Sequence, residues 1–255
     1  MEKVLLHTPE GVRDVYGKEC AVKLTIENSI NKVFNIYGYH NIQTPTFEFF
    51  DIFSKERGSV ASKNLYKFFD REGNTLVLRP DITPSIARLV AKYYMDVKVP
   101  VKLCYNANTY INNSELQGKL KENTQLGCEL INDDSVEADA EILALVVDSL
   151  KAAGLKEFLV EIGHADFYKG LLEECGFDTE NEQELRKRIE NKNYFGVEEI
   201  LDNNNITGQL KEAFLKLPEL FGSIDVIKSA KELTDNKKAL QSIERLEKLY
   251  SILED

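Results

Sequence analysis

The stretch Asn108–Ile131 reads NTYINNSELQGKLKENTQLGCELI and predicts two strands joined by a long polar loop. Gln125 and Glu129 lie four residues apart on the second strand, so the strand period of two points them to the same face as Gly127. An amide and a carboxylate beside a glycine would suit the ammonium group and polar side chain of an amino acid. A solvated sheet face fits the same pattern equally well. The opposite face is the expected core side and consists of Thr124, Leu126, Cys128 and Leu130.

A second group of polar residues lies upstream, in TLVLRPDITPSIARL, residues 75–89. This stretch predicts a strand followed by a helix that begins near Thr83 and Pro84. Arg79, Asp81 and Thr83 therefore lie at a strand end and a helix entrance, where side chains and free backbone amides can meet a ligand. Taken alone, Asp81 and Thr83 are explained more simply as residues that cap the helix.

Outward from these two stretches, periodicity and turn residues predict an α+β fold. Four antiparallel strands in sequence favour one meandering sheet. From residue 168 onward, charged helical stretches predict a helical subdomain, so we expect a core over 1–167 and a helical insertion over 168–255. The expected elements are a helix over 17–37 ended by Gly38, an irregular edge strand over 40–50 around Pro45, a hairpin over 65–81, strands over 99–110 and 122–131, a helix over 135–155 and a strand over 157–167.

The composition excludes several classes of function. The chain has 255 residues with 32 basic and 43 acidic side chains, and its net charge of −11 argues against an extended nucleic-acid surface. Neither G-x-x-x-x-G-K-[ST] nor G-x-G-x-x-G occurs, so these nucleotide-binding loops are absent. No apolar run approaches the roughly 20 residues that span a bilayer, and the first ten residues are too short and polar for a signal peptide. We expect a cytoplasmic protein without membrane contact.

The four cysteines and three histidines suggest neither a metal site nor a catalytic nucleophile. The cysteines are widely separated, with no C-x-x-C pair and no nearby histidine, so we expect reduced core thiols. The histidines lie far apart, and no Ser or Cys stands in a recognisable nucleophile motif. The sequence therefore predicts no metal, no cofactor and structural histidines.

Taken in order, these stretches resemble the catalytic domain of histidyl-tRNA synthetase, a class II aminoacyl-tRNA synthetase, over essentially the whole chain. TPEGVRDVYGKE is similar to that family's N-terminal segment, VFNIYGYHNIQTPTFE to its motif 1, and LYKFFDREGNTLVLRPDITPSIARL to its amino-acid-binding segment. The resemblance implies an antiparallel sheet of the class II synthetase type with flanking helices, and a dimer formed through residues 17–50. It also implies a histidine pocket lined by Asp81, Thr83, Gln125 and Glu129.

The departure from the family lies in motif 2, which in the synthetases reads aromatic, Arg, any residue, Glu. Here the run is Tyr110, Ile111, Asn112 and Asn113. The family's Arg holds the ATP α-phosphate and the reacting carboxylate, and loss of one such group costs on the order of a hundredfold or more in rate. We therefore expect adenylation to be close to absent. The chain also stops before the family's second histidine-specific segment, motif 3 and any anticodon-binding domain, so we expect a fragment that cannot recognise tRNA.

A synthetase-like domain without this chemistry resembles the regulatory-subunit family of ATP phosphoribosyltransferase, and the pair Gly163-His164 strengthens that resemblance. It implies a non-catalytic subunit that assembles with the short catalytic subunit, activates it and conveys feedback inhibition by histidine. Two alternatives stay in view. One is an active ligase, either a divergent histidyl-tRNA synthetase or an enzyme that makes an aminoacyl adenylate; the other is a scaffold module in which Gln125 and Glu129 are solvated surface.

Overall fold

The computed structural model describes residues 6–54, 60–113 and 118–254. The chain forms two compact units, and each is described by itself. The first consists of Met1–Asp134 with Glu141–Glu157, and the second of Ser135–Ala140 with Phe158–Asp255. The division expected from the sequence, between residues 167 and 168, stays a prediction.

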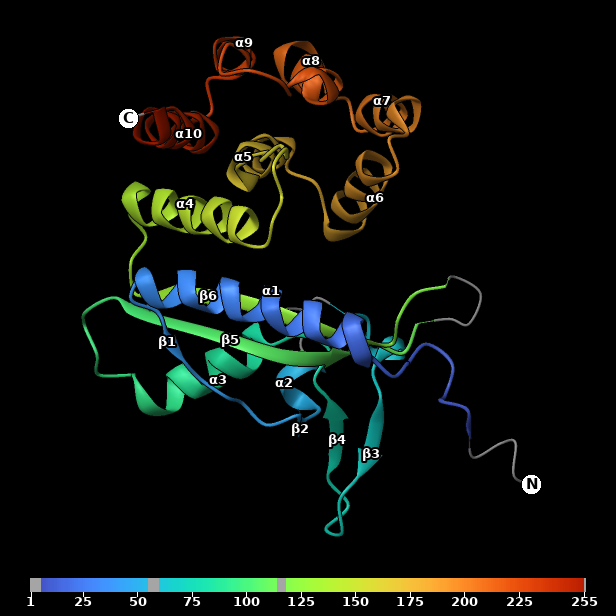
Figure 1. The fold of residues 1–255 in the computed structure, drawn as a ribbon. Helices are drawn as coiled ribbons and strands as arrows, with labels where there is room; N and C mark the ends of the chain where they lie inside the picture. The colour runs from blue at the N-terminus through green and yellow to red at the C-terminus, as the bar shows by residue number, and fades with distance from the viewer. Residues whose placement is uncertain (1–5, 55–59, 114–117, 255) are drawn as a thin grey trace. The chain divides into compact units, whose positions relative to one another are not determined.

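A three-stranded sheet forms the centre of the first unit (Figure 1). Its long strands β5 (Val101–Tyr110) and β6 (Glu122–Ile131) pair antiparallel, with Tyr105 opposite Gly127. The short strand β1 (His40–Asn41) adds in parallel to the other edge of β5. The two strands that were expected over 99–110 and 122–131 are confirmed.

Both faces of this sheet are covered, because the side chains of β5 alternate between two apolar clusters. Helix α1 (Gly17–Ile36) and the later part of α4 (Val136–Ala152) cover one face. The buried residues of the cluster on this face are Phe34, Tyr39, Cys104 and Leu145. Helix α3 (Thr83–Tyr93) covers the other face. That second cluster consists of Ile82, Ile86, Val101, Leu103 and Tyr105.

The expected helix ends are confirmed. Helix α1 stops at Ile36, and Gly38 adopts φ 82°, a left-handed conformation that favours glycine after a helix. Helix α3 begins at Thr83 with Pro84 in its first turn. Thr83 is therefore the first residue of α3.

The expected single meander is wrong, because the hairpin belongs to a separate sheet. Strand β4 (Thr75–Leu78) pairs antiparallel with β2 (Phe47–Phe49) on one edge and with β3 (Lys67–Phe69) on the other. With both edges of β4 occupied, β5 pairs with β1 and β6 instead. The chain between β1 and β2 is irregular around Pro45, as expected, since proline cannot donate to a ladder. The short helices beside this sheet are α2 (Asp51–Ser54) and the 3-10 helix η2 (Ser62–Asn64).

The described part of the second unit contains helices and no strand. Its main core consists of Leu171, Leu185, Val197, Leu201, Ala213, Phe214 and Leu233. The first turn of α4 belongs to this unit, where Arg245 donates to the Asp139 carboxylate at 2.7 Å. The helices are α5 (Ala165–Cys175), α6 (Thr179–Glu190), α7 (Tyr194–Asn203), α8 (Gly208–Lys216), the 3-10 helix η4 (Leu217–Glu219), α9 (Val226–Glu232) and α10 (Lys237–Glu254).

The strand expected over 157–167 is wrong. Residues 158–164 are irregular, and Leu159 is 82% exposed. A strand needs a neighbour's hydrogen-bonding groups, and no described strand pairs with this segment. Residues 165–167 join α5 instead, because the His164 side chain caps that helix by accepting from the Asp166 amide at 3.2 Å.

Among the described residues, no helix is both long and apolar enough to cross a membrane.

Candidate functional site

The four residues that the sequence analysis placed in a pocket come from the start of α3 and from one face of β6. Thr83 Oγ1 donates to Glu129 Oε1 at 2.8 Å, which joins the helix start to the strand. Gln125 lies on the same face of β6 and donates from Nε2 to the Tyr105 hydroxyl at 3.1 Å. Asp81 lies at the helix entrance, where its Oδ1 accepts from the Ile82 amide at 2.7 Å. The structure thus brings the two stretches together.

Capping accounts for part of Asp81 but not for Thr83. Oδ1 of Asp81 also lies 3.5 Å from the Thr83 amide, so this carboxylate supports the first turn of α3. The Thr83 hydroxyl makes no capping bond and is directed to Glu129 instead. Thr83 therefore positions a carboxylate rather than a helix end.

Tyr105 belongs to this cluster, and sequence reasoning missed it. Its ring lies over Gly127, where an added Cβ would overlap the hydroxyl oxygen and the ring carbon that bears it. Gly127 is thus required by the close approach of the tyrosine. The sequence did show Gly127 between the polar residues of this face. The residue that packs on the glycine can be identified only from the strand register, which pairs Tyr105 with Gly127.

This face is partly buried and is not a fully solvated sheet face. Helix α3 packs over part of it, and Tyr105 is only 5% exposed. Burial raises the pKa of Glu129, and the nearby Asp81 carboxylate raises it further, against a lowering by the Thr83 hydrogen bond. Burial, with the charges of Glu129 and Asp81, also raises the pKa of Tyr105 to about 12. Two nearby carboxylates, one of them partly buried, favour a cationic ligand.

We expect Glu129→Gln to stabilise the ligand-free chain near about pH 7 and to lose that effect as the pH falls toward about 4. The folded-state pKa of Glu129 is raised, so its ionised form costs stability above that pKa, and the cost disappears below the unfolded value. Glutamine keeps an oxygen that can accept from Thr83 but carries no charge. Thermal unfolding should show a gain in Tm of about 1–3 °C at neutral pH. A variant less stable at every pH would contradict this electrostatic account.

Arg79 does not reach the cluster. Its side chain is 6% exposed and donates to three backbone carbonyls, those of Thr44 at 2.8 Å, Pro45 at 3.1 Å and Asn108 at 2.8 Å. This arginine therefore joins β5 to the irregular segment before β2. Its guanidinium is committed to the backbone, which argues against a direct role in binding a ligand.

The run that replaces motif 2 also serves local structure. The Ile111 amide donates to the Lys121 carbonyl at 2.9 Å, and the Asn112 amide donates to the Asn64 carbonyl at 2.9 Å. Asn113 Nδ2 lies 3.4 Å from the Leu120 carbonyl. The four loop residues 114–117, part of the loop in the opening stretch, lie outside the described residues. Ile111 supplies no cation at the position where the synthetases carry one.

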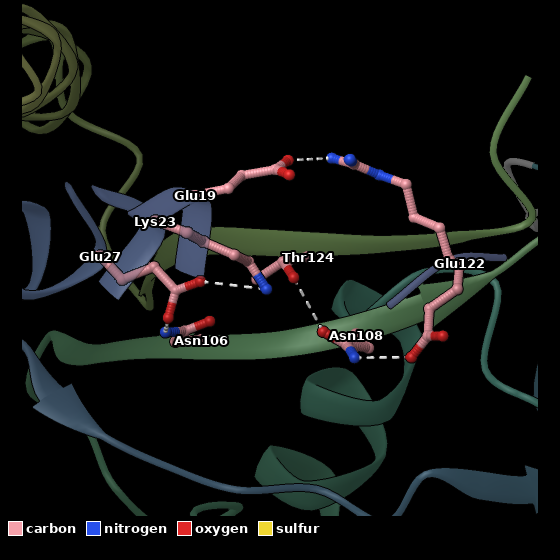
Figure 2. Close-up of polar contacts among 8 residues, drawn as sticks. Glu19, Lys23, Glu27, Asn106, Asn108, Glu122 and Thr124 are labelled. Carbon is pink, nitrogen blue, oxygen red and sulfur yellow. Dashed lines mark hydrogen bonds and ion pairs between the residues drawn. The ribbon is translucent and has the colours of Figure 1, made fainter. Parts of the chain in front are cut away.

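A separate polar network lies on the opposite face of the sheet, under α1 (Figure 2). Asn106 donates to Glu27 at 2.9 Å, and Asn108 donates to Glu122 at 2.7 Å while accepting from Thr124 at 3.0 Å. A hollow of about 410 Å³ adjoins these side chains. These hydrogen bonds join α1 to the sheet and neighbouring strands to each other, which is a structural role.

Comparison with known proteins identifies similar chains over almost the whole sequence. The family model described as histidyl-tRNA synthetase matches residues 11–255. The ATP phosphoribosyltransferase regulatory subunit of Ruminiclostridium cellulolyticum is 46% identical over 255 residues, covering 100% of this chain and 61% of that protein. The protein of the same name from Acetivibrio thermocellus is 40% identical over 250 residues, covering 98% of this chain and 60% of its own length. The chain thus spans about three fifths of these curated relatives.

Solved structures share the fold. A crystal structure described as an ATP phosphoribosyltransferase regulatory subunit/histidyl-tRNA synthetase from Bacillus halodurans matches with a TM-score of 0.88 and 36% identity, covering 98% of this chain and 65% of that chain. Histidyl-tRNA synthetase from Nostoc sp. matches with a TM-score of 0.78 and 17% identity over 98% of this chain and 58% of that chain. The second likeness concerns the fold alone, which is of the class II synthetase type.

Proposed function

The chain belongs to the histidyl-tRNA synthetase family, and from that premise we propose that it is a non-catalytic regulatory subunit of ATP phosphoribosyltransferase in histidine biosynthesis. It assembles with the short catalytic subunit in the cytoplasm, activates it and conveys feedback inhibition by histidine. The observation that supports the proposal is a polar cluster in which Thr83 donates to Glu129, while Ile111 stands in the motif 2 position and supplies no cation. The regulatory-subunit names of relatives at 46% and 40% identity support the same assignment.

The pocket chemistry suits the α-ammonium group of histidine. Glu129 and Asp81 provide negative charge, and Gln125 provides an amide oxygen that can accept a hydrogen bond. A cation that enters this partly desolvated site would lower the cost of keeping Glu129 ionised. The Tyr105 hydroxyl accepts a hydrogen bond from Gln125, so we expect Tyr105 to position Gln125 rather than to contact the ammonium itself.

Adenylation requires positive charge that the motif 2 position of this chain does not provide. The reaction places charge on the ATP α-phosphate, and preorganised cationic donors stabilise it. Ile111 provides no such group, and the nearby Arg79 is bound to backbone carbonyls. The proposed subunit therefore senses histidine without activating it.

Sensing also requires an equilibrium between two assemblies. Histidine can inhibit only if it binds the inhibited assembly more tightly than the active one, because equal affinity shifts nothing.

The test is the rate of phosphoribosyl-ATP formation by the short catalytic subunit of the same organism, with and without the protein that carries this sequence, across a histidine titration. We expect the rate to rise when the protein is added and to fall with histidine. A rate that is unchanged, together with a failure to co-elute, would overturn the proposal. Histidine-dependent exchange of pyrophosphate into ATP would instead support the ligase alternative.

We also propose that the subunit dimerises through the segment around residues 17–50. This segment presents large apolar side chains to solvent within the isolated chain, including Val22 and Leu24 of α1 and Phe47 and Phe49 of β2, each 50–55% exposed. We expect Phe49→Asp to raise the dimer dissociation constant about tenfold or more, because a charge would be buried without a partner. Analytical ultracentrifugation measures it.

The matched control for this interface is Phe195→Asp in the second unit, where the phenylalanine is 81% exposed. That variant should keep the dimer. If both variants dimerise as the original chain does, the proposed interface is wrong.

A further inference from the structure

The structure places two of the four cysteines directly opposite each other. Cys104 of β5 and Cys128 of β6 are cross-strand partners in the central sheet. They lie in one apolar cluster with Phe34, Tyr39 and Leu145, and both thiols are free. The two cysteines are separated by twenty-three residues in the sequence, and only the pairing of β5 with β6 brings them together.

Cys104 and Cys128 form a non-hydrogen-bonded pair, the type of antiparallel pair in which the side chains lie closest. The Cys104 carbonyl accepts from the Ile42 amide at 2.9 Å, so it is directed toward β1 and away from β6. Further along the same strand pair, the Ile111 amide donates to Lys121, which makes the odd-numbered residues of β5 the hydrogen-bonded ones toward β6. Cys104 and Cys128 are therefore a non-hydrogen-bonded pair. In such a pair the Cα atoms lie about 4.5 Å apart, within the range of about 4.4–6.8 Å that a disulfide accepts.

The cysteine pair lies on the face of the sheet opposite to the proposed histidine site. Cys104 precedes Tyr105, and Cys128 stands between Gly127 and Glu129. The side chains of Tyr105 and Glu129 point to the other face of the sheet, where Tyr105 lies over Gly127. A bond that adjusts the spacing of β5 and β6 at the cysteines must move the neighbouring residues on both strands. Tyr105 packs tightly on Gly127, so the pocket face cannot absorb such a change unnoticed.

We propose that Cys104 and Cys128 form a reversible cross-strand disulfide on exposure to a peroxide, and that this bond alters the pocket on the opposite face. The thiolate of the partly buried Cys128 attacks one peroxide oxygen, which breaks the O–O bond and gives a sulfenic acid and hydroxide. The Cys104 thiol then attacks that sulfur, and its proton leaves with the hydroxyl as water. The two thiols are oxidised by two electrons, and hydrogen peroxide is reduced to two water molecules. A small thiol reverses the bond by exchange.

Burial controls the rate of the first step. It raises the pKa of Cys128 to about 11, with a further contribution from the Glu129 charge, and it also raises the pKa of Cys104. Only the thiolate reacts, so oxidation should be slow near neutral pH and should accelerate about tenfold for each unit by which the pH rises toward that pKa. A buried pair of this kind responds to sustained oxidation rather than to brief exposure.

The experiment treats the chain with hydrogen peroxide and follows intact mass and peptide maps. We expect the loss of two hydrogen atoms and a peptide that joins Cys104 to Cys128, both reversed by dithiothreitol. The double variant Cys20→Ser/Cys175→Ser should form the bond, and Cys128→Ala should not. Cys104→Val provides a second pair-breaking variant with a buried apolar side chain. Failure to form the bond, or a bond that involves Cys20 or Cys175, would overturn the proposal.

The effect on the pocket is measured in two ways, one of which rests on the proposed function. Calorimetry should show that histidine affinity falls about threefold or more in the oxidised chain, which is a modest coupling between sites. Amide hydrogen exchange over residues 81–86 should differ between the oxidised and reduced chains, since Thr83 contacts Glu129 directly. Unchanged exchange would overturn the coupling. If the reduced chain binds no histidine, the proposed function fails, and the exchange measurement alone decides the coupling.

Discussion

Replacing Glu129 with alanine is expected to weaken histidine binding by about a hundredfold or more and to remove histidine inhibition of the assembled enzyme. Glu129 is partly desolvated, and among the described residues it accepts a hydrogen bond from the uncharged Thr83 hydroxyl. The ligand's ammonium group would then enter a partly buried site with one carboxylate fewer, a loss of about 3 kcal/mol or more. Isothermal titration calorimetry measures the affinity, and phosphoribosyl-ATP formation measures the inhibition.

The control for this loss is Glu122→Ala on the same strand. Glu122 lies on the opposite face, where it accepts from Asn108, so its removal should leave histidine affinity unchanged (Figure 2). Glu129→Ala should still assemble with the catalytic subunit and activate it. If Glu129→Ala binds histidine as well as the original chain does, the effector binds elsewhere, and the scaffold interpretation of Gln125 and Glu129 gains support.

The part of the site that the sequence could predict is the part that depends on strand period. Gln125 and Glu129 share a face because they are an even number of residues apart, and the structure has them so. Thr83 was assigned to the same pocket only through the family resemblance, since a helix start and a strand 46 residues further on have no local signal that joins them. Whether these residues bind histidine stays a prediction.

Tyr105 and the cysteine pair were beyond sequence reasoning for one physical reason. Each depends on the register of β5 against β6, and register is fixed by packing on both faces rather than by the order of residues. The same limit explains the wrong single meander. The sequence predicts which residues of a strand share a face, but it does not predict which strands pair. Strand β4 pairs on both edges within its own sheet, with β2 and β3.

The second large effect is expected at Arg79. Arg79→Met should destabilise the chain by about 3 kcal/mol or more, because three backbone carbonyls would each lose a donor in a buried site. Methionine fills a similar volume, so the loss reports hydrogen bonding rather than a cavity. This is a large fraction of the roughly 5–15 kcal/mol that holds a domain folded. Urea unfolding, followed by circular dichroism, measures it.

The matched control is Arg71→Met. Arg71 lies in the exposed turn between β3 and β4, so this substitution should change the free energy of unfolding by less than about 0.5 kcal/mol. Arg79 stands two residues before Asp81, so its position alone made it a candidate ligand group. A structural role requires that Arg79→Met lose stability, with histidine affinity intact in whatever fraction stays folded. If the variant instead kept its stability and lost histidine binding, Arg79 would be a ligand-binding cation, and the absence of catalytic charge inferred from Ile111 would no longer hold.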